Sequence, residues 1–227
     1  MQAELGINVI NQPKIYLVHA MTVSMAPIEA SFRTHWPQAR LAHVLDDSLM
    51  SDFLLDGRLT EAMIKRFRRL GRYCAGAHAD AMLFTCSAFG PAIEAVKRDQ
   101  RIPVLKSNEA MYDDLVAKGG RAALLATFPP SLPSMLSEIQ THAKQAGAQV
   151  EVKTHLVEGA LEALLDQRPD EHNQLIAEAV PAFANYDTIA FAQFSMAPAL
   201  NLAQARVSTP ILTTPDSAVK KLKALLA

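Results

Sequence analysis

The chain has 227 residues, of which half are apolar and a fifth are charged, and its formal net charge is −1 at pH 7. This length suits one large domain or two small ones, and the balanced charge excludes the basic surface expected of a nucleic-acid or membrane-surface binder. Two cysteines are too few for a disulfide framework, and residues 1–13 lack a secretory signal, so we expect a cytoplasmic protein.

Apolar runs typical of strands alternate with amphipathic runs typical of helices. In chain order, strands are expected at 15–19, 41–45, 81–85 and 103–105, and helices at 27–35, 60–77 and 91–98. Five basic residues from Lys65 to Arg72 fall on the second helix, where their spacing indicates a solvated face rather than a phosphate site. This alternation predicts a parallel sheet covered by helices on both faces.

The same order recurs when the chain is laid on itself with a gapless shift of 107 residues, which places Asp80 on Asp187 and Phe84 on Phe191. We therefore predict an α/β fold of two pseudo-symmetric, doubly wound lobes with parallel sheets. Residues 1–107 and a returning C-terminal helix at 215–227 would form the first lobe, and residues 108–214 the second. A helix at 108–118, stopped by Gly119 and Gly120, would cross between them. Ligands of such sheets bind at the carboxyl ends of the strands, so a cleft between the lobes is the expected site.

Cys86 is the leading candidate for chemistry in this cleft. It follows a buried strand and precedes a helix that starts near Pro91, so backbone N–H groups and the helix dipole lie close to its thiol. Such surroundings can bind an anion and lower a thiol pKa, and Ser87 adds a hydroxyl donor. Cys74 lies within an expected helix and is interpreted as a small buried side chain.

At this point the chain resembles the aspartate/glutamate racemase superfamily, which includes hydantoin racemase, maleate isomerase and arylmalonate decarboxylase. The resemblance covers nearly the whole chain. It rests on 85–87 as a first cysteine motif, on 102–104 with 109–111, on 126–128 at the opening of the second lobe, and on 187–193 as a second motif. It implies a cofactor-independent racemase or isomerase that acts beside a carboxylate. It also implies a homodimer.

The second motif carries Gln193 where the racemases have a cysteine. An amide does not titrate in the useful range, so a mechanism with two thiols is excluded. Another residue could supply the second face, and His19 is the best candidate because it ends the first strand and titrates near neutrality. His19 could equally be a structural histidine near the cleft. Asp47 is a further candidate, although 46–48 could be a solvated turn or a helix cap.

Two other enzymatic hypotheses and one non-enzymatic hypothesis stay open. Cys86 could donate one proton to the enediolate left by decarboxylation of a substituted malonate. It could instead be a nucleophile that attacks a double bond or a carbonyl carbon. The chain could also be a carboxylate-binding protein whose catalysis has lapsed.

Substrate binding is expected from loop residues that share a place at the strand ends: Ser87, Asp47, Ser48, Thr127, Phe128, Phe194 and Ser195. Backbone N–H groups and the hydroxyls would stabilise an enediolate-like charge. Phe89, Phe128 and Phe194 would favour an apolar substrate side chain unless they anchor the loops in the core. No Arg or Lys lies in either catalytic loop, which argues against a dicarboxylate such as aspartate.

No cofactor and no metal ion is expected, because the chain has neither a Gly-rich phosphate loop nor metal-ligand spacing. The expected partner is a small substrate that contains a carboxylate, with no nucleic acid and no membrane.

Overall fold

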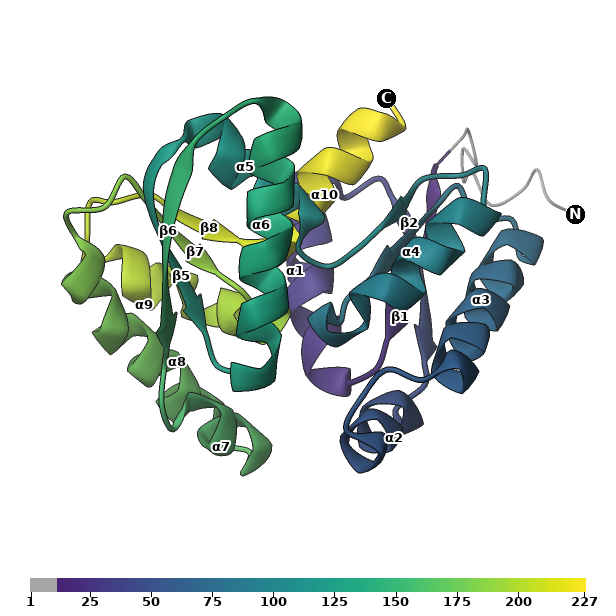
Figure 1. Cartoon of the computed structure of the whole chain (residues 1–227), viewed down its shortest axis with the longest axis horizontal. Coiled ribbons are helices and arrows are strands. Elements are labelled where there is room, and N and C mark those ends of the chain that lie inside the picture. The colour runs from purple at the N-terminus through teal and green to yellow at the C-terminus, as the bar shows by residue number, and fades with distance from the viewer. Residues whose placement is uncertain (1–11) are drawn as a thin grey trace, which may run out of the picture.

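Two four-stranded parallel sheets lie side by side in the computed structural model, which describes residues 12–227 (Figure 1). Residues 1–11 lie outside the described residues. They make up most of residues 1–13, the segment in which no secretory signal was predicted. The strand order is β2-β1-β3-β4 in the first sheet and β6-β5-β7-β8 in the second. The predicted α/β class with two similar parallel sheets is thus confirmed.

The first sheet and its helices alternate along the chain as the apolar runs predicted. The strands are β1 (Lys14–His19), β2 (Arg40–Leu45), β3 (Ala81–Phe84) and β4 (Val104–Leu105). The helices are α1 (Met25–His35), α2 (Ser48–Asp56), α3 (Glu61–Gly76), α4 (Gly90–Asp99) and α5 (Glu109–Lys118). The helix α2 follows the segment 46–48, for which a helix cap was one of the interpretations.

The second sheet follows the same plan. Its strands are β5 (Gly120–Ala126), β6 (Val150–Leu156), β7 (Thr188–Phe191) and β8 (Ile211–Thr213). The helices are α6 (Leu132–Ala146), α7 (Ala160–Leu165), α8 (Pro169–Ala179), α9 (Leu200–Gln204) and α10 (Thr214–Leu225). Short 3-10 helices follow four strands, at Thr22–Ser24, Ser87–Phe89, Pro129–Ser131 and Phe194–Ala199.

The internal repeat is visible in the hydrogen-bond register of the sheets. Ile15 of β1 pairs with Ala81 of β3, and Ala122 of β5 pairs with Thr188 of β7. Both members of the second pair lie 107 positions after those of the first, which is the shift found in the sequence. The strand ends that carry the loops are therefore equivalent in the two lobes.

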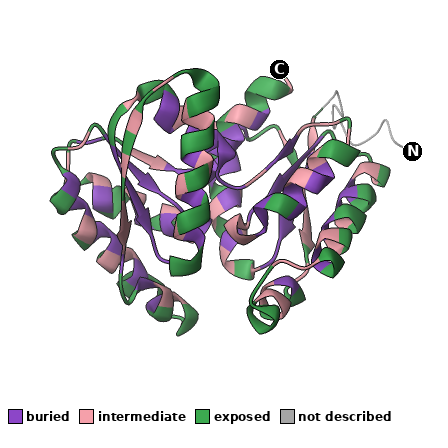
Figure 2. Ribbon diagram, in the orientation of Figure 1, coloured by how far each residue is buried: buried purple, intermediate pink, exposed green. Residues whose placement is uncertain are grey.

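The pleat of β1 divides its side chains between two cores. Ile15 and Leu17 pack with residues of α1 and α10, whereas Tyr16 and Val18 pack with residues of α3 and α4. The central strands β1, β3, β5 and β7 are mostly buried, whereas the edge strands β2 and β6 are only partly buried and the outer helices expose one face (Figure 2). Side-chain alternation therefore also decides which way the residue at each strand end points.

The two ends of the fold are tied together by α10. Thr213 caps this helix by accepting a hydrogen bond from the backbone N–H of Asp216, and proline stands in its first turn. Ser31 of α1 donates to the Asp216 carboxylate, while Ser217 donates to Asp114 of α5. The helix α10 thus contacts α1, which precedes residue 107, and α5, which follows it. We propose that the boundary between the two lobes lies at residue 107.

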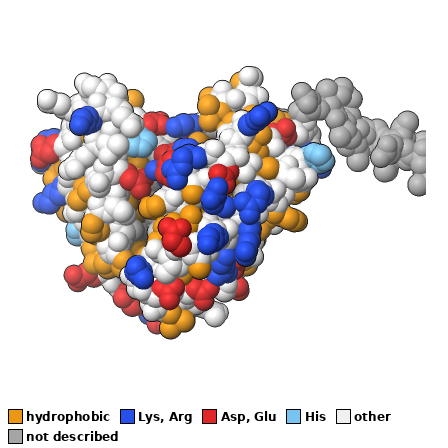
Figure 3. Space-filling model, turned by 45° about the vertical axis from the view of Figure 1, so that its right-hand side comes forward, with side chains coloured by type: hydrophobic (Ala, Val, Ile, Leu, Met, Phe, Trp, Pro, Cys, Tyr) orange, Lys and Arg blue, Asp and Glu red, His pale blue; other side chains and the backbone are white. Residues whose placement is uncertain are grey.

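Basic side chains gather on the first lobe, over α3 (Figure 3). Arg66 is bonded to Asp46 and Asp52, and Arg68 is bonded to Asp99. These pairs fit a solvated helix face rather than a phosphate site. Within residues 12–227, none of the helices has the length and hydropathy that crossing a bilayer requires.

Candidate active site

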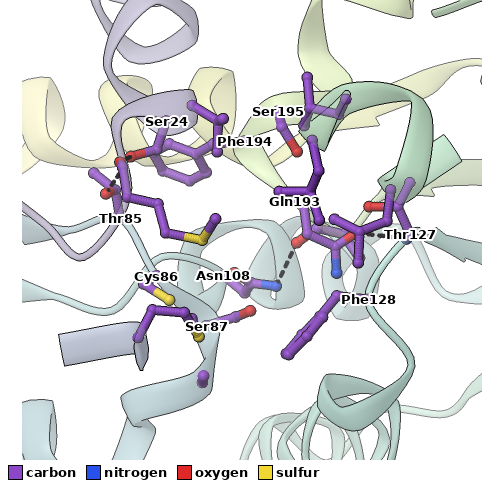
Figure 4. Close-up of a pocket in the computed structure, with 18 of the residues that line it drawn as sticks. Ser24, Thr85, Cys86, Ser87, Asn108, Thr127, Phe128, Gln193, Phe194 and Ser195 are labelled. Atoms are coloured by element: carbon purple, nitrogen blue, oxygen red, sulfur yellow. Dashed lines mark hydrogen bonds between the residues drawn. The ribbon is translucent and has the colours of Figure 1, made fainter. Parts of the chain in front are cut away.

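A cavity of about 230 Å³ lies between the lobes, at the carboxyl ends of the central strands. The first lobe contributes 85–88 and the second contributes Thr127, Phe128 and 192–195, so the equivalent loops of the repeat meet there. Figure 4 shows Cys86 and Ser87 on one side of this space and Gln193, Thr127 and Phe128 on the other. The predicted cleft is therefore present, and both halves of the duplication build it.

The thiol of Cys86 lies where the sequence placed it, directly after β3 and directly before the 3-10 helix Ser87–Phe89. The residue is half-buried and lines the cavity. Its pKa differs from the expectation, because burial raises the pKa of Cys86 to about 11 although the backbone N–H of Ala88 lowers it in part. Desolvation outweighs the helix terminus, so this thiol is protonated at neutral pH.

Gln193 stands opposite, directly before the 3-10 helix Phe194–Ala199. Its side-chain oxygen accepts a hydrogen bond of 2.9 Å from the backbone N–H of Thr127, and its amide nitrogen donates to Ser131 at 3.3 Å. The amide therefore joins the two loops of the second lobe and fixes the position of Thr127.

Hydrogen-bond donors surround the space between Cys86 and Gln193. Ser87, Thr127 and Ser195 all line the cavity, as predicted. Asn108 lines it as well, and its amide nitrogen donates to the backbone carbonyl of Ala192 at 2.9 Å. Asn108 was not among the residues predicted from the sequence, although its place at the start of the crossing helix, between the lobes, could have indicated it.

His19 does not face the cavity, which corrects the expectation that the end of β1 would point it there. Its side chain is fully buried, with Nδ1 2.9 Å from the hydroxyl oxygens of Ser24 and Thr85. Burial, together with the neighbouring His43 ring, lowers the pKa of His19 to about 4. The physical reason is the pleat, because odd-numbered residues of β1 point toward α1 and not beyond the strand end.

Asp47 and Ser48 also lie outside the cavity lining and are exposed. They begin α2, and the Ser48 hydroxyl donates to Asp46 at 2.7 Å. The helix instead buries Leu49 and presents Met50 and Leu54 to the cavity. Of the interpretations of 46–48, the start of a helix is the one that the structure has. The helix α2 brings apolar side chains to the cavity, and neither Asp47 nor Ser48 reaches it.

Most of the remaining wall is apolar. Phe128 and Phe194 line the cavity as predicted, whereas Phe89 is fully buried in the core. The other apolar side chains come from the loop after β1, from α2 and from α7: Met21, Val23, Met50, Leu54, Leu161, Leu164 and Leu165. The lining described here includes no Lys, Arg, His, Asp or Glu. Among residues 12–227, no cluster of three or more side chains is suited to hold a metal ion.

His172 connects the apolar wall to the loop that contains Ser195, and it was not predicted from the sequence. It is buried in α8, with Nδ1 2.7 Å from the carbonyl oxygen of Ala160 and Nε2 3.1 Å from that of Ser195. One imidazole therefore ties the start of α7 to the Ser195 loop.

The sequence of the chain matches a known protein family. A family model described as Asp/Glu/hydantoin racemase matches residues 28–182 of the chain. No curated protein sequence matches it significantly.

Solved structures share the fold at low sequence identity. An aspartate racemase from Picrophilus torridus superposes with a TM-score of 0.72 at 9% identity, covering 94% of each chain. An allantoin racemase from Klebsiella pneumoniae gives 0.69 at 16% identity, over 95% of this chain and 88% of the other. A variant of arylmalonate decarboxylase gives 0.63 at 14% identity, over 94% and 93%.

Proposed function

Since the chain belongs to the Asp/Glu/hydantoin racemase family, we propose that it is a cofactor-independent enzyme that moves a proton at a carbon atom beside a carboxylate, with Cys86 as the acid. One observation carries this proposal. Cys86 is the only residue in the described cavity lining whose side chain carries an ionisable proton. Its high pKa leaves the proton on the sulfur at rest, which suits donation to carbon better than nucleophilic attack.

A single acid favours a reaction that needs a proton on one face only. Decarboxylation of a 2-substituted malonate is such a reaction: the carbon–carbon bond breaks, carbon dioxide leaves, and the enediolate takes one proton from Cys86. Ser87, Thr127 and Ser195, with nearby backbone N–H groups, would hold the carboxylate on which charge develops. The second carboxylate would face the apolar wall, where it leaves as neutral carbon dioxide and its charge moves to the enediolate, which the hydrogen-bond donors hold.

Racemisation is the second candidate, favoured by the family of the chain. It requires a second acid or base on the opposite face of the carbon. Gln193 cannot fill that role, and His19 reaches the cavity only through the hydroxyls of Ser24 and Thr85. A small carboxylate as substrate, a homodimer and a cytoplasmic location remain parts of the proposal.

The test is proton NMR in deuterated water with aryl- and alkyl-substituted malonates and chiral 2-substituted carboxylates. Wild type is compared with Cys86→Ser, and Cys74→Ala is the matched control because Cys74 is buried away from the cavity. We expect turnover in wild type and in Cys74→Ala and its loss in Cys86→Ser. Equal turnover in Cys86→Ser would reject the assigned role of the thiol.

A further inference from the structure

His172 of α8 is a buried ionisable group that the proposed reaction does not use. Its side chain is 1% exposed and lies outside the cavity lining. Both ring nitrogens have partners, because Nδ1 lies 2.7 Å from the carbonyl oxygen of Ala160 and Nε2 lies 3.1 Å from that of Ser195. A backbone carbonyl only accepts hydrogen bonds, so the ring has an acceptor on each side.

The two acceptors determine what the ring can bond in each charge state. A neutral imidazole carries one N–H, so it can donate to one of the two carbonyls and turns a lone pair toward the other. The imidazolium form carries two N–H groups and can donate to both. The geometry of His172, with both nitrogens at hydrogen-bond distance from a carbonyl oxygen, therefore fits the protonated ring.

No acidic side chain accounts for this fit. Among residues 12–227, none of the ion pairs includes His172. The elements packed against α8 are α7, α9 and two 3-10 helices, Val180–Phe183 and Phe194–Ala199. The charged residues of these elements, of α8 itself and of the turns before α7 and α8 are all exposed: Glu158, Glu162, Asp166, Arg168, Asp170, Glu171 and Glu178. The two carbonyls are thus the polar groups that meet the His172 ring.

The two carbonyls belong to different walls of the cavity. Ala160 begins α7, which contributes Leu161 and Leu164 to the apolar wall. Ser195 lies beside Gln193 at the cavity (Figure 4). A ring that bonds both carbonyls holds the backbone of Ser195 at a fixed distance from the start of α7. These two bonds are called the His172 clamp below.

We propose that His172 is a positioning residue that completes the substrate site only while its ring is protonated. When the ring loses a proton to solvent, the bond to Ala160 is the one that remains, because it is the shorter of the two. The lone pair of Nε2 then faces the Ser195 carbonyl, and repulsion between them loosens the loop. This inference rests on the proposed function, in which Ser195 helps to hold the substrate carboxylate. Substrate binding therefore weakens as pH rises through the titration of His172.

Two measurements on the substrate-free enzyme test the His172 clamp itself. The ¹⁵N NMR shifts of Nδ1 and Nε2 should show two N–H groups at low pH and one at high pH. Amide hydrogen exchange of residues 194–196, corrected for the intrinsic effect of pH, should speed up about tenfold through the same midpoint. A ring that keeps one charge state between about pH 5 and pH 9, or an unchanged exchange rate, would overturn the inference.

A kinetic measurement links the clamp to substrate. The pH dependence of kcat/KM reports groups that titrate in the free enzyme. In wild type we expect kcat/KM for a 2-substituted malonate to fall about tenfold as pH rises through the NMR midpoint of His172. This comparison of midpoints needs no variant, and two different midpoints would count against the clamp.

Two variants separate His172 from other titrating groups. In His172→Gln the amide does not titrate, so kcat/KM should be low throughout and lack this fall. His155→Gln is the control, because His155 lies on β6 of the same lobe and outside the cavity lining, and the fall should persist in it. Ionisation of the substrate affects all these proteins equally. The same fall in His172→Gln would reject the inference.

Failure of this inference and failure of the proposed function give different results. Absence of the clamp in the two substrate-free measurements would reject the inference and leave the role of Cys86 untouched. Equal turnover in wild type and Cys86→Ser would reject the proposed role of the thiol, while the substrate-free measurements would still decide on the clamp.

Discussion

Gln193 holds the position in the second lobe that Cys86 holds in the first, and its amide is bonded to the backbone N–H of Thr127 at 2.9 Å. The two lobes are alike in topology, yet one presents a protonated thiol and the other a fixed amide. Under the proposed function, a substrate between them would meet an acid on one face only.

Placing a thiol at the second position should change the stereochemical outcome. In Gln193→Cys we expect product of mixed handedness, because either face of the enediolate can then be protonated. Loss of the bond to Thr127 should lower the free energy of unfolding by about 1 kcal/mol. Chiral chromatography of the product measures the first effect and urea denaturation the second.

The control for this prediction is Gln193→Ser, which also loses the bond to Thr127 but adds no acid of suitable pKa. Its product should keep the handedness of the wild type. A single enantiomer from Gln193→Cys, formed at an undiminished rate, would show that the position does not face the reacting carbon.

The raised pKa of Cys86 predicts a distinctive pH dependence of alkylation. The rate of reaction with iodoacetamide should climb as pH rises toward about 11. Because the folded pKa lies above the ordinary value of 9.0, the thiol stabilises the fold below pH 9, and this contribution is lost as pH rises toward 11. Mass spectrometry of the Cys86 peptide follows the reaction, and a rate that is flat from pH 6 to 8 would contradict the prediction.

His19 should make folding stability depend on pH in the acid range. Its pKa falls from 6.5 to about 4 on folding, so the unfolded chain binds the proton more tightly. Stability is then complete above pH 6.5 and declines as pH falls toward 4, by on the order of 3 kcal/mol. In His19→Asn this part of the decline should vanish, which urea denaturation at pH 5 and pH 7.5 would show. An identical decline in both proteins would place its origin elsewhere.

The leucines at the cavity should affect binding more than folding. Leu54 lines the cavity although its side chain is 61% exposed, so Leu54→Asn should change the free energy of unfolding by at most about 0.5 kcal/mol. KM for an aryl-substituted malonate should rise about tenfold, because an apolar contact is lost. Leu202→Asn is the control, since Leu202 is also exposed but lies outside the cavity lining. An equal KM in the two variants would remove Leu54 from the substrate site.

Local sequence patterns determined the strands, the repeat and the position of Cys86, because short apolar runs bounded by turn residues indicate buried parallel strands directly. They could not determine the direction of His19, since the last residue of a strand points to whichever face the pleat dictates. The sequence left a helix cap open at 46–48, but it did not show that Asp47 and Ser48 are exposed while Met50 and Leu54 of α2 line the cavity. Burial raises the pKa of Cys86, whereas the sequence predicted a lowered one. This burial depends on packing from several elements, so the sequence around Cys86 alone could not indicate it.

The handedness of the proton transfer tests the central claim most directly. A prochiral malonate with one aryl and one alkyl substituent would be incubated with wild type and Cys86→Ser in deuterated water, and the product analysed by NMR and chiral chromatography. The account predicts carbon dioxide release with one deuterium in a single enantiomer from wild type, and no enzymatic product from Cys86→Ser. A racemic product from wild type, or an unchanged enantiomer formed by Cys86→Ser, would contradict it.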